Sequence, residues 1–228
     1  MSTTLSTSAA PLDAGPAPAL GLPAPPTSRT PAPWEAGADL EKNGEGMYGP
    51  RGWSVRAGVW HELARCRDEL RSTVIPAEYG FAPAGFIGDD GVPVDDYTPF
   101  HDLGPGIARR LLEILPDPQL EDRQNLGPTL GVLLRACVRA RGRVRLSGYA
   151  IGPQRRDERL SVEGLWIADP DLLGYELAEE HDEHCRCQDL WELVRERYDL
   201  DAYGVPDEVK LLRRHWTRGP VGTWIWWD

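Results

Sequence analysis

The chain has 228 residues, and 25 Lys and Arg against 36 Asp and Glu give it a formal net charge of −11. No stretch approaches the roughly 20 apolar residues that cross a bilayer, and the first ten residues lack the positive charge and apolar core of a secretory signal. Four cysteines are too few for a disulfide scaffold. We therefore expect a cytoplasmic protein without a membrane partner, whose overall charge opposes general polyanion binding.

The N-terminal segment differs in composition from the rest of the chain. Residues 1–33 contain eight Pro, seven Ala and nine Ser or Thr, and their only charges are Asp13 and Arg29. Such a segment buries too little apolar surface to offset its ordering entropy. We predict a disordered tail over residues 1–45 and a single mixed α+β domain over residues 46–228.

The first half of this domain is predicted to be helical around one long loop. Apolar residues recur at helical spacing over 57–72. Residues 77–100 hold three Pro, four Gly and two Asp-Asp pairs, which favours a loop. Proline at a first-turn position, followed by apolar residues at helical spacing, predicts two more helices over 105–115 and 128–141.

The second half begins with two alternating segments. Residues 143–151 and 160–168 each alternate apolar and polar side chains, which predicts an antiparallel pair of strands. In the second strand the alternation places one set of residues on a common face: Leu160, Val162, Gly164, Trp166 and Ala168.

The C-terminal region is predicted to be helical up to its last residues. Asp169 is a candidate N-cap, a second helix carries Leu190 and Tyr198, and a third runs from Pro206 to Trp216. The closing segment 223–227 is aromatic and β-prone, so we expect it to join the sheet as a third strand.

These elements define the expected fold. It is α+β, with a disordered Pro/Ala-rich tail and about five or six helices around a small antiparallel sheet. The helices over 105–115 and 128–141 and the following hairpin come in the order of a winged-helix domain, which would place the second helix in a DNA groove.

Positive charge is concentrated in one stretch. Residues 135–160 hold eight Arg and two acidic residues, so this stretch carries +6 and the remainder of the chain −17. One interpretation is a DNA-binding surface that contacts phosphates. The other is that the basic hairpin docks on the acidic helices that follow it. The candidate nucleic-acid contacts are Arg135, Arg139, Arg143, Arg145, Arg155 and Arg156.

A metal site and an aromatic surface are two further candidates. His181, Cys185 and Cys187 are zinc-type ligands, but they lie within seven residues and no second ligand pair follows, so we favour a solvated acidic segment. Among nine tryptophans, Trp224 and Trp226 would share one strand face and Trp227 the other. We expect them to seal the core, with Trp227 partly exposed. The alternatives are a protein-contact surface or a platform for nucleic-acid bases.

No catalytic signature is present: the chain has no P-loop, no G-x-G-x-x-G, no H-E-x-x-H and no G-x-S-x-G. Residues 143–167 (RVRLSGYAIGPQRRDERLSVEGLWI) and the closing PDEVKLLRRHW…GTWIWWD resemble uncharacterised proteins of actinobacterial plasmids, integrative elements and phages. These include accessory regulators of transfer or replication. The resemblance implies a regulatory or accessory role and no particular functional residue.

Three functions follow from these observations. The first is a non-enzymatic regulatory or accessory protein of a mobile element that contacts DNA through its arginine-rich helix and hairpin. The second is a protein-interaction module that uses the acidic C-terminal helices and the terminal tryptophans. The third and weakest is a small metal-dependent enzyme built on the His181 cluster.

Overall fold

The computed structural model describes residues 44–72, 87–88, 91–178, 184–215 and 218–228. The predicted tail therefore lies outside the described residues except for Gly44 and Glu45. From there Glu45–Gly46 (β1) and Gly49–Pro50 (β2) form a short antiparallel hairpin. Within the described ranges, no helix combines the length and the apolar character that crossing a membrane requires.

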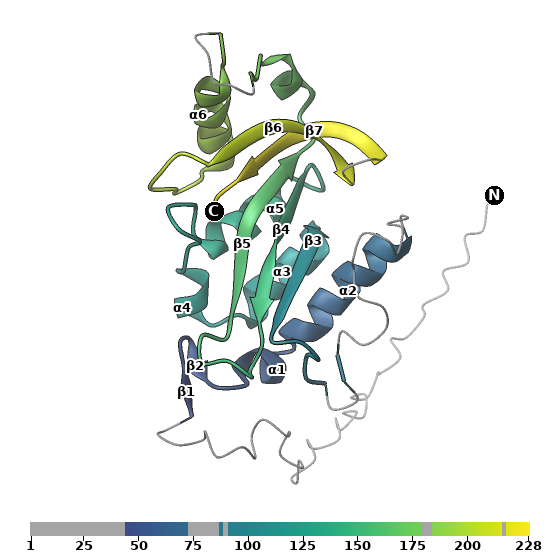
Figure 1. Cartoon of the computed structure of the whole chain (residues 1–228), viewed down its shortest axis with the longest axis vertical. Helices are drawn as coiled ribbons and strands as arrows, with labels where there is room; N and C mark the ends of the chain where they lie inside the picture. The colour runs from purple at the N-terminus through teal and green to yellow at the C-terminus, as the bar shows by residue number, and fades with distance from the viewer. Residues whose placement is uncertain (1–43, 73–86, 89–90, 179–183, 216–217) are drawn as a thin grey trace, which may run out of the picture. The chain divides into compact units, whose positions relative to one another are not determined.

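The described domain is mixed α+β, as predicted (Figure 1). After the first hairpin the elements are α1 (Trp53–Ala57), α2 (Val59–Ser72), β3 (Tyr97–Leu103), α3 (Pro105–Ile114), α4 (Asp117–Leu120), α5 (Leu130–Arg139), β4 (Val144–Ile151), β5 (Arg159–Ile167), the 3₁₀ helix η3 (Pro170–Gly174), α6 (Cys187–Tyr198), β6 (Glu208–His215) and β7 (Arg218–Trp226).

The five longer strands form one antiparallel sheet in the order β3-β4-β5-β7-β6. β4 and β5 pair along their lengths, which confirms the predicted hairpin. β7 pairs with β5, which confirms that the C-terminal segment joins the sheet. Because β3 and β7 flank the hairpin on both sides, it is an interior part of the sheet, and the winged-helix arrangement is not confirmed.

Helices α3 and α5 pack against one face of the sheet and against each other (Figure 1). Their apolar stripes meet the inward residues of the hairpin, including Leu146 and Leu165. Cys137 of α5 lies in this interface, where burial raises the pKa of its thiol to about 12. The thiol therefore packs as a small apolar group. The largest fully buried side chains that α3 and α5 contribute to the core are Ile107, Leu111, Leu133 and Leu134.

The predicted helix from Pro206 to Trp216 is wrong. The described part of this segment is the edge strand β6, which pairs with β7 from Glu208↔Trp226 to His215↔Arg218. Val209 and Leu212 stand at helical spacing, but a strand is also compatible with this short pattern. Pairing of the backbone with β7 decides the outcome, and the local propensity of the segment carries no information about this partner strand.

Two other predictions change at the sheet. The loop predicted over 77–100 is wrong at its end, because β3 begins at Tyr97; Pro99 is tolerated there since β3 is an edge strand. Ser147 pairs with Gly164 while Gly148 pairs with Val162, so a β-bulge at Glu163 interrupts the predicted alternation of β5.

The exposure of the C-terminal tryptophans is opposite to the prediction. Trp227 is 1% exposed and packs edge-on against Trp191 of α6, with ring centroids 5.4 Å apart. Trp224 and Trp226 share a face, as predicted, and both are partly exposed. The bulge also places Trp166 beside Trp224 on that face, away from the core side.

Candidate functional site

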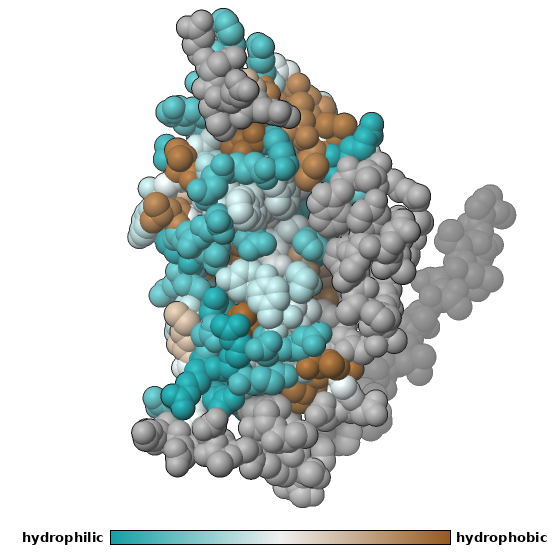
Figure 2. Space-filling model, viewed as in Figure 1, coloured by the Kyte–Doolittle hydropathy of each residue, from teal (hydrophilic) through white to brown (hydrophobic). Residues whose placement is uncertain are grey.

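The sheet face opposite α3 and α5, here called the outer face, carries most of the aromatic and polar side chains of the strands. Figure 1 is viewed from this side, with α3 and α5 behind the strands. Figure 2 shows weakly hydrophilic residues across its middle and strongly hydrophilic ones around them. By strand register, the outer-face residues include Tyr97, Arg145, Ser147, Tyr149, Arg159, Ser161, Trp166, Glu208, Lys210, Leu212, Trp224 and Trp226.

Two indoles lie flat on this face because each covers a glycine of the neighbouring strand. A Cβ at Gly222 would stand 2.4 Å from Cε2 of Trp166, and one at Gly164 would stand 2.6 Å from Cη2 of Trp224. Only glycine leaves room for such close contacts. The two reciprocal contacts fix both rings across the β5–β7 junction.

The indole N–H groups fix the rings further. Trp166 donates to the carbonyl of Leu212 at 2.8 Å, and Trp224 donates to Oε2 of Glu208 at 3.0 Å. Both acceptors belong to β6. The hydrogen bonds therefore tie three strands together and hold the aromatic floor in a single orientation.

A groove of about 370 Å³ lies over the Trp224 part of this floor and continues to Trp226. It is lined by Trp224 and Trp226 of β7 and by Glu208, Lys210 and Leu212 of β6. The groove is shallow and open to solvent, so it suits a ligand laid across the surface rather than one enclosed in a cavity. We refer to these five residues as the tryptophan groove.

Acidic groups surround the tryptophan groove. The backbone N–H of Asp228 donates to Asp207 at 2.9 Å, and that of Asp207 donates to the carbonyl of Trp226 at 2.9 Å. Burial raises the pKa of Glu163, and the charge of Asp228 raises it further, against a hydrogen bond from Trp226 that lowers it. The groove lining itself has one cation, Lys210, which donates to Glu208 at 2.5 Å.

A polar cluster adjoins the groove where β3 bulges. Asp102 has a φ of 58°, and its carboxylate accepts two hydrogen bonds from Arg214, at 2.7 and 2.6 Å. Nε2 of His215 lies 3.3 Å from Oδ2 of Asp102. Burial lowers the pKa of the neighbouring His101 to about 4. The cavity that these residues line has about 20 Å³ of water-accessible volume, which is the size of a single water molecule. The Arg214–Asp102 pair ties β6 to β3 at this point.

The six arginines predicted to bind DNA do not form one surface. Arg135 and Arg139 are exposed on α5, and Arg139 donates to the carbonyl of Tyr198 at 2.8 Å. Arg145 is partly buried on the outer face, and its Nε–H has no acceptor among the described residues. Arg155 and Arg156 are exposed in the turn between β4 and β5.

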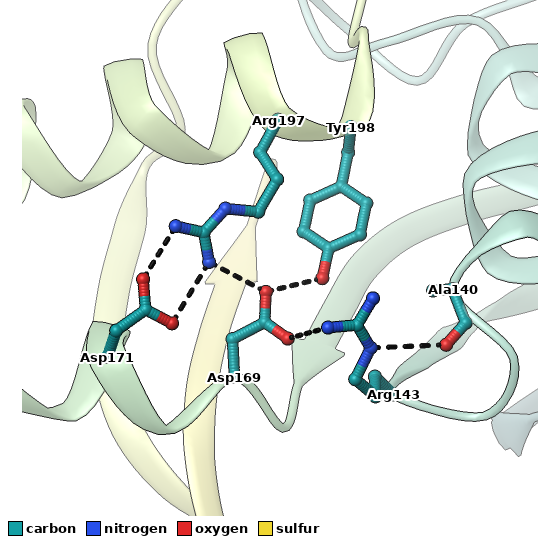
Figure 3. A network of polar contacts seen from close by, with 6 residues as sticks. All are labelled: Ala140, Arg143, Asp169, Asp171, Arg197 and Tyr198. Carbon is teal, nitrogen blue, oxygen red and sulfur yellow. Dashed lines mark hydrogen bonds and ion pairs between the residues drawn. The ribbon is translucent and has the colours of Figure 1, made fainter.

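Two of the six form ion pairs within the domain. Arg155 pairs with Asp157 at 2.7 Å. Arg143 donates to Asp169 at 3.1 Å, and Arg197 and Tyr198 of α6 donate to the same carboxylate at 2.8 and 2.7 Å (Figure 3). Asp169 stands at the N-cap position of η3, but its side chain makes no cap hydrogen bond and instead joins the residue before β4 to α6.

The hairpin turn is also attached to the domain through a buried acid. Glu158 is 0% exposed and accepts hydrogen bonds from the N–H groups of Gly52 and Ser54, at 2.6 and 2.9 Å, and from the Ser54 hydroxyl at 2.5 Å. Burial raises the pKa of this carboxyl. The turn is therefore docked on the start of α1.

Two of the three candidate metal ligands, Cys185 and Cys187, are among the described residues. His181 lies outside the described residues. Cys185 and Cys187 are partly buried thiols outside any disulfide, and Sγ of Cys185 lies 3.7 Å from the carbonyl of Ala178. In the ranges that the structure describes, no group of three or more His, Cys, Asp or Glu has the arrangement to hold a metal ion. The zinc hypothesis stays a prediction.

Comparison with known proteins identifies no relative of this chain. No family model matches the chain, and neither does any curated protein or solved structure.

Sequence reasoning identified Trp224 and Trp226 but missed the groups that make them a site. Alternation alone places Trp166 on the same face as Leu160 and Val162, and no local signal marks Glu163 or Glu208. A signal was present: Gly164 and Trp166 on β5, and Gly222 and Trp224 on β7, form the same Gly-x-Trp pattern. When two such strands pair in antiparallel, each tryptophan ring covers the glycine of the neighbouring strand.

Proposed function

We propose that this protein is a non-enzymatic interaction module whose tryptophan groove binds a segment of a partner protein. One observation carries the proposal: Trp224 and Trp226 are partly exposed side by side in a groove of about 370 Å³. Tryptophan is strongly enriched among the residues that dominate binding energy at protein interfaces. A pair of such rings in a concave surface is a natural anchor point for a peptide.

Buried residues and fixed contacts beneath the groove hold its rings in place, which favours binding without rearrangement. Between the two rings Ile225 is 0% exposed, and the following Trp227 is 1% exposed. The Trp224 ring is further held by Gly164 and Glu208. Immobilising side chains on association costs binding energy, so rings that are already fixed leave more of the contact energy for the partner.

Charge favours a protein partner over a nucleic acid at this surface. Asp207, Glu208 and Asp228 would repel phosphates near the groove, and Arg143 and Arg155 already pair with acids elsewhere. DNA contact by an accessory protein of a mobile element, through the arginine-rich helix and hairpin, stays a separate prediction that rests on the sequence.

Selection of peptides from a random displayed library tests the proposal. We expect the full-length protein to enrich a set of related peptides, and Trp226→Ala to lose most of them. Val205→Ala is the matched control, because Val205 is apolar, 67% exposed and not part of the groove lining. Thermal melts of each variant confirm that the fold is retained. Failure to enrich any peptide, or equal enrichment by Trp226→Ala, would refute the proposal.

A further inference from the structure

We propose that the tryptophan groove recognises an arginine side chain of the partner segment, stacked on the indoles of Trp224 and Trp226 and paired with the surrounding carboxylates. This inference rests on the proposed function, since it names the chemistry of the peptide that the groove would hold. It follows from charge complementarity and from the geometry of the rings.

The first argument is the charge around the rings. Four acidic residues lie along the groove and the neighbouring strand ends, whereas Lys210 is the cation in the groove lining. A cation from a partner would therefore find net negative charge at this position. The four acids are Glu163, Asp207, Glu208 and Asp228.

The second argument concerns the carboxylate of Glu208. Its two oxygens accept from Trp224 and Lys210, at 3.0 and 2.5 Å. An ionised carboxylate offers about four lone-pair sites, so it can accept further hydrogen bonds. The bond to the indole N–H holds this carboxylate at the ring edge, where a cation stacked on the ring face would come within its reach.

The third argument concerns Glu163. It is partly buried, and the charge of Asp228 raises its pKa while the neighbouring Trp226 lowers it. The rise in its pKa shows that the charged form is poorly compensated in the free protein. An incoming cation would relieve this cost, whereas a neutral side chain would not.

The shape of the floor selects among cations. A guanidinium is planar, weakly hydrated and stacks on aromatic rings, whereas an ammonium is a compact and strongly hydrated point charge. The Trp224 ring extends across the sheet to Gly164, where an added Cβ would stand 2.6 Å from Cη2, and we infer that it turns a ring face to the groove. Tryptophan is also the best aromatic partner for a cation. A flat ring bordered by carboxylates therefore suits arginine better than lysine.

Nuclear magnetic resonance of the full-length chain tests the inference, because each of the nine tryptophans contributes one indole N–H signal. The signals of Trp224 and Trp226 are assigned with Trp224→Phe and Trp226→Phe. The probe is acetyl-Gly-Gly-Arg-Gly-Gly-amide, titrated beside the same peptide with citrulline, a neutral isostere, in place of arginine.

We expect the arginine peptide to shift the two groove signals selectively and to bind about tenfold more tightly than the citrulline peptide. Glu208→Gln should weaken binding of the arginine peptide, whereas Asp189→Asn should not. Asp189 is an exposed acid on α6 that pairs with Arg186, so it controls for general negative charge. Added salt should weaken binding of the arginine peptide only.

The outcomes separate this inference from the proposed function. Equal binding of the arginine and citrulline peptides would overturn the inference, as would displayed peptides that depend on Trp226 but carry no arginine. Either result would leave the interaction module standing. No shift with either peptide, together with no enrichment from the library, would overturn both.

Discussion

Acidification should destabilise the protein through His101. Burial lowers the pKa of this imidazole from its ordinary value of 6.5 to about 4, against the opposing charge of Asp102. Between these two values the unfolded chain binds a proton at His101 and the folded chain does not. The contribution to stability is therefore complete above pH 6.5 and is lost as the pH falls through this window.

The magnitude follows from the size of the shift. A difference of roughly 2.5 pKa units corresponds to about 3 kcal/mol over the whole window. Between pH 7 and pH 5 the linkage relation gives a loss of about 2 kcal/mol in the free energy of unfolding. This is a large part of the stability of an ordinary domain.

Urea denaturation at pH 7 and pH 5 measures this effect by comparison with His101→Gln. The wild type should lose about 2 kcal/mol more than the variant between these pH values, because other titrating groups are common to both. His61→Gln, in an exposed position of α2, should behave like the wild type. Equal losses in the wild type and His101→Gln would refute the argument.

Three further predictions concern the sheet and its ion pairs. Gly222→Ala should destabilise the fold by at least about 2 kcal/mol, because the new Cβ meets Trp166, whereas Gly106→Ala in α3 meets nothing within 4 Å and should stabilise it by about 0.5–1 kcal/mol; thermal melts check both. Asp169→Asn should cost about 2–3 kcal/mol in urea denaturation, since this buried carboxylate serves Arg143, Arg197 and Tyr198, whereas Asp171→Asn, with a 59% exposed side chain, should cost less than about 1 kcal/mol. A comparable loss for both Asp variants would contradict this. The double variant Arg155→Ala/Arg156→Ala should melt like the wild type, because Glu158 rather than these arginines anchors the turn; if the hairpin binds DNA, the same variant should flatten the salt dependence by about two units in gel-shift titrations.

Local patterns were sufficient for several elements. The helices α3 and α5 and the β4–β5 hairpin follow from apolar periodicity and from proline and glycine at the element ends. Each of these signals acts within one element, where side chains three or four residues apart share a helix face and alternate residues share a strand face. The mixed α+β class follows from the same signals.

Long-range pairing decided the remainder. Val209 and Leu212 fit a helix as well as a strand, and only the backbone of β7 makes this segment β6. One extra residue in β5, Glu163, exchanges the faces of everything after it and moves Trp166 to the outer face. A strand has a side-chain period of two, so a single bulge reverses an assignment that periodicity alone would make.

The functional surface depended on the tertiary structure for the same reason. The sequence determined that two tryptophans two residues apart share a strand face, because alternation is a property of the strand itself. Which face meets solvent depends on where α3 and α5 pack, and the acids beside Trp226 come from strands β5 and β6 and from the C-terminus. Likewise, the concentration of arginine was visible in the sequence, but only packing showed that Arg143 is paired with Asp169 and that Arg145 lies on the opposite surface from Arg139. Charge counts along a chain carry no information about the distances between charges, and those distances set the interaction energies.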